Sequence, residues 1–182
     1  MGIYCYMIGI FYSSGPRPLS SLPLGEFFSG FTMGFMITLI CVYINAYQVF
    51  QWDWQSVWHV FVVALPNTCL IANLMLANNI CDLEEDQRNG RFTLVHYLGK
   101  TRALQAFVGL QLIALVAVGY GVWSGLTPVT LLLVATVVPF SWKQTSVFLR
   151  KQIKVETFSC AVKILAVGAS AQVLFFVIGL WL

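Results

Sequence analysis

Residues 57–91 read VWHVFVVALPNTCLIANLMLANNICDLEEDQRNGR, and this stretch decides what kind of fold the chain can adopt. Its first part, residues 57–77, is predominantly apolar. About 20 such residues are needed for one α-helix to cross the hydrocarbon core of a membrane. Pro66 lies inside the run and predicts a kink. The run then passes directly into a cluster of acidic residues. We therefore predict a membrane helix that ends in a negatively charged segment.

The composition of the whole chain also indicates a membrane protein. Of the 182 residues, 59% are hydrophobic and only 9% are charged, and the mean hydropathy is +0.81. A soluble domain carries about 25% charged residues, so these values exclude a soluble globular protein as well as a disordered or collagen-like one. The net charge of +3 is too small and too scattered to indicate nucleic-acid binding. The five cysteines are dispersed through apolar runs, which predicts packing rather than disulfides or a zinc site.

Further apolar runs extend this interpretation to the whole chain, which we predict to be an all-α, multi-pass transmembrane helical bundle with a single membrane domain over residues 1–182. The apolar run near Met1 has no basic segment before it and no cleavage site after it, so it is not typical of a signal peptide. We expect the chain to be truncated at its N-terminus. The predicted spanning helices are 27–50, 57–77, 104–123, 127–142 (or 127–149) and 161–182, and the run 3–12 is too short to span alone.

The distribution of basic residues predicts the orientation of the bundle. Three loops on one side (13–26, 78–103 and 143–160) hold nine of the ten Lys and Arg residues. The loops on the other side, 51–56 and 124–126, hold none. Cytoplasmic loops of membrane proteins carry an excess of Lys and Arg. We therefore predict a multi-pass protein of the cell membrane with its acidic segment on the cytoplasmic side.

The acidic segment has a regular spacing. Asn78, Asp82 and Asp86 follow one another at intervals of four, so on a continuous helix they share one face. Glu85 lies three residues after Asp82 and could flank this face. Glu84 points elsewhere, and we expect it to be solvated. One face would then present an amide and two carboxylates.

Two carboxylates on one helix face repel each other, and a bound cation would offset this repulsion. Mg²⁺ is usually held by one or two carboxylates together with substrate phosphates. Basic residues that follow the cluster, among them Arg91 and Lys100, could neutralise phosphate oxygens. The pattern favours a diphosphate site, and the alternative is a mixed-charge loop that is simply solvated.

The same residues resemble a known family. Residues 78–86 (NNICDLEED), followed by 89–94 (NGRFTL), are similar to the second aspartate-rich motif of the UbiA superfamily of intramembrane prenyltransferases, N-x-x-x-D-x-x-x-D and then G-[KR]-x-T-L. The branch most similar to this chain prenylates 1,4-dihydroxy-2-naphthoate in menaquinone synthesis. Residues 12–18 and 23–30 resemble the segment that precedes the fifth helix of that branch. By this resemblance, the chain corresponds to helices four to nine of the nine-helix family fold.

This resemblance implies an enzyme that transfers a polyprenyl group from its diphosphate to an aromatic acceptor, with Mg²⁺ as cofactor. The partners would be the polyprenyl diphosphate, the aromatic acceptor and the lipid bilayer, and no nucleic acid. By the same resemblance, Asp82 and Asp86 are the expected metal ligands and catalytic residues, and Asn78, Arg91 and Lys100 are the expected substrate-binding residues.

The family carries a first aspartate-rich motif, and this chain has no second acidic cluster that could replace it. We therefore expect the chain alone to be inactive and to need an N-terminal fragment that supplies the first motif. A non-catalytic remnant and a membrane transporter are the alternatives. A transporter would predict ionisable residues at mid-membrane depth, and the runs contain none near their centres. A CDP-alcohol phosphotransferase is disfavoured, because the D-G-x-x-A-R element is absent and Asn78 stands where that family has glycine.

Overall fold

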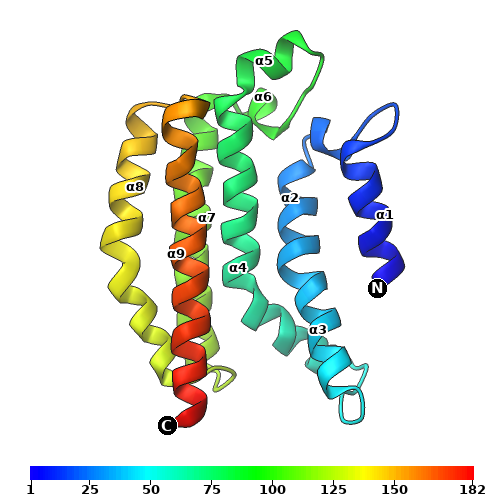
Figure 1. Cartoon of the computed structure of the whole chain (residues 1–182), viewed down its shortest axis with the longest axis vertical. Coiled ribbons are helices and arrows are strands. Elements are labelled where there is room, and N and C mark those ends of the chain that lie inside the picture. The colour runs from blue at the N-terminus through cyan, green and yellow to red at the C-terminus, as the bar shows by residue number, and fades with distance from the viewer.

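The computed structural model describes all 182 residues, and every regular element in it is a helix. Long helical segments lie side by side and run along the long axis of the molecule (Figure 1). Several of the segments are continuous with a neighbour, so that α2, η2 and α3 form one rod and η3 and α8 form another. In chain order the elements are α1 (Gly2–Ser13), η1 (Leu19–Ser21), α2 (Gly25–Ser29), η2 (Gly30–Met36), α3 (Ile37–Ala46), α4 (Trp54–Cys81), α5 (Leu83–Arg88), α6 (Leu94–Leu98), α7 (Lys100–Trp123), η3 (Val129–Val137), α8 (Val138–Arg150) and α9 (Lys154–Trp181).

Five helical segments are long and apolar enough to cross a membrane, the same number as the spans predicted from the sequence. They are Gly25–Ala46, Trp54–Cys81, Lys100–Trp123, Val129–Arg150 and Lys154–Trp181. Their ends differ from the predicted ones. The last helix begins at residue 154 rather than 161, and the first ends at 46 rather than 50. Apolar composition marks the residues that can lie in hydrocarbon but not the residue at which helical hydrogen bonding starts or stops. A helix can therefore begin before its apolar run, as α9 does, or end inside it, as α3 does.

Helix α4 forms the centre of the bundle. It packs against α2 and η2 on one side and against α7 and α9 on the other, and Figure 1 shows it between these two groups. The largest hydrophobic cluster joins Leu76 and Ile80 of α4 to Phe107 of α7, Phe148 of α8 and Ile164 of α9. These side chains are almost completely buried. Helix association in a membrane depends on close packing of this kind, because lipid is as apolar as the side chains.

The chain remains helical through Pro66, and α4 bends along its first half (Figure 1). A proline removes one backbone hydrogen bond and its ring crowds the preceding turn, which kinks a helix. The bend agrees with the kink predicted from the sequence. It inclines the first turns of α4 toward α3, while the later turns stand between the two halves of the bundle.

Two glycines bring η2 and α4 into very close contact. A Cβ atom built on Gly30 would lie 2.7 Å from the backbone oxygen of Thr68, and one built on Gly34 would lie 2.4 Å from the Cα of Thr68. No side chain larger than hydrogen fits at either position. The G-x-x-x-G pair therefore acts as the packing device that its spacing predicts. Residues Gly30–Met36 form a π-helix at this contact.

The two ends of the bundle differ in character. At one end, the backbone N–H of Phe92 donates to the carbonyl of Ser21 (3.1 Å), so the segment before α2 and the segment after α5 touch. The acidic segment and the start of α9 meet at this same end (Figure 1). Exposed tryptophans gather near the opposite end, as expected for an aromatic belt at a membrane surface: Trp52, Trp54, Trp58 and Trp123.

Candidate functional site at the end of helix α4

The site begins where α4 ends. Its last residue is Cys81, and Asp82 follows with φ −94° and ψ 4°, outside helical geometry. Hydrogen bonds nevertheless continue across the break, from the Asp82 N–H to the Asn78 carbonyl (3.0 Å) and from the Asp86 N–H to the Asp82 carbonyl (2.8 Å). Asn78, Asp82 and Asp86 are therefore still connected in series by backbone hydrogen bonds between residues four apart. The single continuous helix implied by the spacing is wrong, because α5 is a separate helix that is inclined to α4 (Figure 1).

Asp82 is a buried carboxylate with two partners on one oxygen. Its Oδ2 accepts a hydrogen bond from Nδ2 of Asn78 at 3.3 Å. The same Oδ2 forms an ion pair with the ammonium group of Lys154, the first residue of α9. The Asp82 side chain is 11% exposed and that of Lys154 is 50% exposed. A hydrogen bond from a charged donor is stronger than one from a neutral donor, so the ion pair with Lys154 is the stronger of the two contacts of Asp82.

Asp86 is still more deeply buried, with 3% of its surface exposed. Its Oδ1 lies 3.3 Å from Nη1 of Arg91. Its Oδ2 is buried and has no hydrogen-bond partner. Burial raises the pKa of Asp86 above its usual value, while the neighbouring Arg91 lowers this pKa and the charge of Asp82 raises it further. A buried carboxylate oxygen without a donor is the kind of group that a cation would satisfy.

Arg91 is held in place from several directions. Its backbone N–H donates to the carbonyl of Asp86 at 2.8 Å, and its Nη2 donates to the carbonyl of Ser20 at 3.2 Å. Ser20 belongs to η1, which lies 71 residues earlier in the chain. The guanidinium group thus connects the segment before α2 to the acidic cluster. This arrangement fixes the position of one positive charge beside Asp86.

The other predicted residues are less closely associated with the cluster. Lys100 begins α7 and is exposed, and it forms no ion pair. Glu84 is exposed, as predicted, and Glu85 is exposed as well. His96 is also exposed, and its Nδ1 lies 3.2 Å from Nε2 of Gln87.

Two further residues at this end of the bundle lie outside the site that the sequence predicts. Lys154 reaches Asp82 across 72 residues of sequence. Glu26, at the start of α2, is 5% exposed, and its Oε1 accepts a hydrogen bond from Nδ2 of Asn79 at 2.8 Å. An acidic side chain at the head of an apolar helix is a sequence signal for Glu26. For Lys154 the only signal is its location on the same predicted side of the membrane as the acidic cluster.

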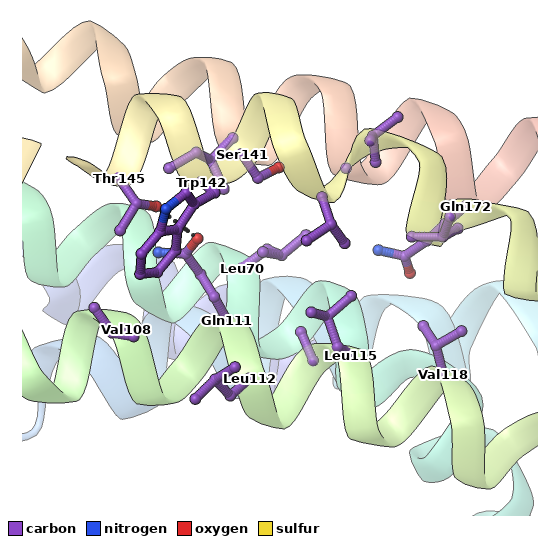
Figure 2. Close-up of a pocket in the computed structure, with 16 residues that line it drawn as sticks. Leu70, Val108, Gln111, Leu112, Leu115, Val118, Ser141, Trp142, Thr145 and Gln172 are labelled. Atoms are coloured by element: carbon purple, nitrogen blue, oxygen red, sulfur yellow. Dashed lines mark hydrogen bonds between the residues drawn. The ribbon is translucent and has the colours of Figure 1, made fainter. Parts of the chain in front are cut away.

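A separate cavity lies within the apolar part of the bundle. It has a volume of about 100 Å³ and is surrounded by α4, α7, α9 and the rod formed by η3 and α8. Figure 2 shows Thr145 and Gln111 on its wall, where the Thr145 hydroxyl donates to Oε1 of Gln111 at 2.9 Å. No acidic or basic residue lines it. The cavity is therefore distinct from the acidic cluster.

The residues present are compatible with a magnesium ion that a substrate helps to hold. No three His, Cys, Asp or Glu side chains lie close enough together to hold a metal ion by themselves. Mg²⁺ does not need such a cage, because it is usually bound by one or two carboxylates, several waters and substrate phosphates. Asp82 and Asp86, whose Oδ2 has no partner, would be the two carboxylates of such a site.

Comparison with known proteins assigns the chain to a family by its sequence. A 1,4-dihydroxy-2-naphthoate octaprenyltransferase of Bacillus subtilis (strain 168) is 35% identical to this chain over 104 residues, which are 57% of this chain and 31% of that protein. The aligned part thus spans about a third of that relative. No solved structure matches the chain. The sequence profile of the UbiA prenyltransferase family matches residues 1–167. Because this match covers most of its length, the chain belongs to the UbiA prenyltransferase family.

Proposed function

We propose that this chain contributes one side of a Mg²⁺-dependent site that transfers a polyprenyl group from its diphosphate to an aromatic acceptor. The observation that carries the proposal is the pair of buried carboxylates at the end of α4, each beside a basic side chain. The name of the Bacillus subtilis relative suggests 1,4-dihydroxy-2-naphthoate as the acceptor, and with it a role in menaquinone synthesis. Family membership supports the prenyl donor and the aromatic acceptor as substrate classes.

Asp82 and Asp86 would hold the metal, and Asn78 would keep the Asp82 carboxylate in position through its amide. A magnesium ion, when bound, would stabilise the negative charge that develops on the departing diphosphate. Arg91 and Lys100 would contribute positive charge to the same leaving group from the segments after the acidic cluster. The C–O bond of the donor breaks as the diphosphate leaves with the electron pair, and the allylic carbocation then forms a C–C bond with the electron-rich ring. The ring regains its aromaticity by losing a proton, or a carboxylate group as CO₂, from the carbon that was attacked.

The location of the site suits a substrate with a charged head and an apolar tail. The acidic cluster lies at one end of the bundle, where α5 projects beyond the long helices (Figure 1). The diphosphate would bind at this polar end, on the side that the basic residues predict to be cytoplasmic. The prenyl chain would extend along the apolar helices or into lipid. This arrangement keeps the charge out of the hydrocarbon and so avoids a large desolvation cost.

A single acidic cluster can hold a diphosphate from one side only. The 182 residues contain no other cluster of acidic side chains. We therefore propose that prenyl transfer requires a second carboxylate cluster from another segment or another chain. A non-catalytic binding protein would bind Mg²⁺ and diphosphate in the same way but would transfer nothing when the second cluster is supplied.

The test compares site variants in a complete assay. Membranes that contain this chain and a co-expressed three-helix segment with the first aspartate-rich motif receive radiolabelled farnesyl diphosphate and 1,4-dihydroxy-2-naphthoate. We expect labelled product from the pair of segments and none from either segment alone. Asp82→Asn and Asp86→Asn should each reduce the product by about a hundredfold or more, since each removes a charged ligand. The matched control is Glu84→Gln, which removes an exposed charge from the same short helix and should retain activity. Equal losses in all three variants would contradict the proposal.

A further inference from the structure

The ion pair between Lys154 and Asp82 connects two segments that are far apart in the sequence. Lys154 is the first residue of α9, and its ammonium group lies on Oδ2 of Asp82. Half of the Lys154 side chain is exposed, whereas the Asp82 side chain is almost fully covered. The lysine therefore approaches the buried carboxylate from the solvent side. It has no other hydrogen bond that would hold it there.

The second cation of the site is held differently. Arg91 makes an ion pair with Asp86 and also donates hydrogen bonds through Nη2 and its backbone N–H. It is therefore fixed to the surrounding backbone. Lys154 is a single charge on a flexible four-carbon chain with one polar contact, so it can leave its carboxylate without breaking any other hydrogen bond. Of the two cations, Lys154 is the one able to move.

A divalent cation and the ammonium group of Lys154 compete for the same carboxylate. A metal ion bound to Asp82 would lie within a few ångströms of the ammonium group, and two positive charges at that separation repel each other strongly. The ammonium group must therefore move away when a metal binds. A metal that arrives with a diphosphate brings several negative oxygens to the same location. The displaced ammonium group would then lie beside a new anionic partner.

We propose that Lys154 is an exchangeable counter-ion, which pairs with Asp82 in the absence of substrate and transfers to the diphosphate when the metal–diphosphate complex binds. This inference deepens the proposed function and rests on it. It adds a diphosphate-binding residue from the start of α9, outside the sequence motif at residues 78–94. It also makes metal and diphosphate binding mutually dependent, because the lysine opposes binding of the metal alone and favours binding of the complex.

The exchange predicts that one substitution of Lys154 changes the affinity for the metal alone and the affinity for the metal–diphosphate complex in opposite directions. Lys154→Gln removes the competitor for Asp82, so Mn²⁺ alone should bind about fivefold more tightly. The same substitution removes a charged partner of the diphosphate, so Mg²⁺-pyrophosphate should bind about tenfold more weakly. A lysine that only stabilises the fold would not produce an increase in one affinity and a decrease in the other.

The experiment uses the 182-residue chain purified in detergent. Binding of Mn²⁺ alone is measured by the loss of the free-ion electron paramagnetic resonance signal, and binding of pyrophosphate in excess Mg²⁺ is measured by isothermal titration calorimetry. The control is Lys151→Gln, which removes the same charge three residues away, where Lys151 pairs with Glu156 at 2.7 Å. Both affinities should remain as in the wild type in this control. Lys154→Arg keeps the charge and should retain pyrophosphate binding.

The possible outcomes separate this inference from the function on which it rests. If the wild-type chain binds no pyrophosphate in the presence of Mg²⁺, the inference fails, whereas the proposed function fails if the transfer assay with the co-expressed segment gives no product. If the wild-type chain binds both probes and Lys154→Gln changes neither affinity, or weakens both, only the inference fails. The inference is also overturned if Lys151→Gln reproduces the changes seen in Lys154→Gln, because the effect would then be one of overall charge.

Discussion

Nδ2 of Asn79 donates a 2.8 Å hydrogen bond to Oε1 of Glu26, and both side chains are buried although 53 residues separate them in the sequence. The other carboxyl oxygen of Glu26, Oε2, is buried without a partner. This contact joins the head of α2 to the last turn of α4, one residue after Asn78. It therefore links the packing of the two helices to the position of the acidic cluster.

The first prediction concerns this contact. Asn79→Ala removes the side-chain hydrogen bond of the buried Glu26 carboxyl, and we expect it to reduce the free energy of unfolding by about 2 kcal/mol. Thermal unfolding of the purified chain in detergent measures the effect. The control is Asn45→Ala, since Nδ2 of Asn45 bonds only to the exposed carbonyl of Cys41 in the same helix. Equal stability losses in the two variants would show that the contact has no special importance.

The second prediction concerns the close contact of η2 with α4. Gly34→Ala places a Cβ atom 2.4 Å from the Cα of Thr68, a backbone atom that cannot move away by rotation of a side chain. We expect the helices to be forced apart and the melting temperature to fall by several degrees, as for an overpacked core. Gly109→Ala in α7 meets no atom within 4 Å and should leave stability unchanged or slightly higher. A tolerated Gly34→Ala would mean that the two helices can separate here at little cost.

The amino-acid sequence predicts most of the fold because each spanning helix is defined by its own residues. The apolar runs alone predict five spans, and the spacing of Gly30 and Gly34 permits the close helix contact that the structure shows. The ends of the helices are less predictable, since composition does not show where helical hydrogen bonding stops. The break at Asp82 illustrates this, because the intervals of four in the sequence are equally consistent with an unbroken helix.

The site is predictable only where its contacts are local. Asn78, Asp82 and Asp86 are neighbours through the repeat of the helix, and Arg91 follows within a few residues. By contrast, the pairing of Lys154 with Asp82 depends on which helices are adjacent in space, and the chain carries no local pattern that specifies this. The same holds for Glu26 and Asn79, whose pairing depends on how α2 packs against α4.

The third prediction concerns orientation. The basic loops predict that the acidic end of the bundle faces the cytoplasm. A cysteine at exposed Arg88 should therefore react with a membrane-impermeant maleimide only after the cells are permeabilised, whereas one at exposed Gln51 should react in intact cells. Both are compared with the wild type, whose own cysteines set the background. Labelling of Arg88→Cys from outside intact cells would reverse the topology.

The last prediction concerns the pH dependence that Asp86 contributes. Burial raises its pKa in the folded chain above the usual 3.8, so the folded state binds a proton more tightly than the unfolded state does. The stabilising contribution of the protonated side chain is complete below pH 3.8 and is lost as pH rises through the raised pKa. Asp86→Asn removes this titration. The melting temperature of the wild type should therefore fall relative to that of Asp86→Asn as pH is raised from 3.8. Mn²⁺ binding to the wild type should strengthen over the same pH range, because the metal needs the ionised carboxylate. Parallel melting profiles for the two proteins, measured in detergent across this range, would show that Asp86 titrates as it does in the unfolded chain.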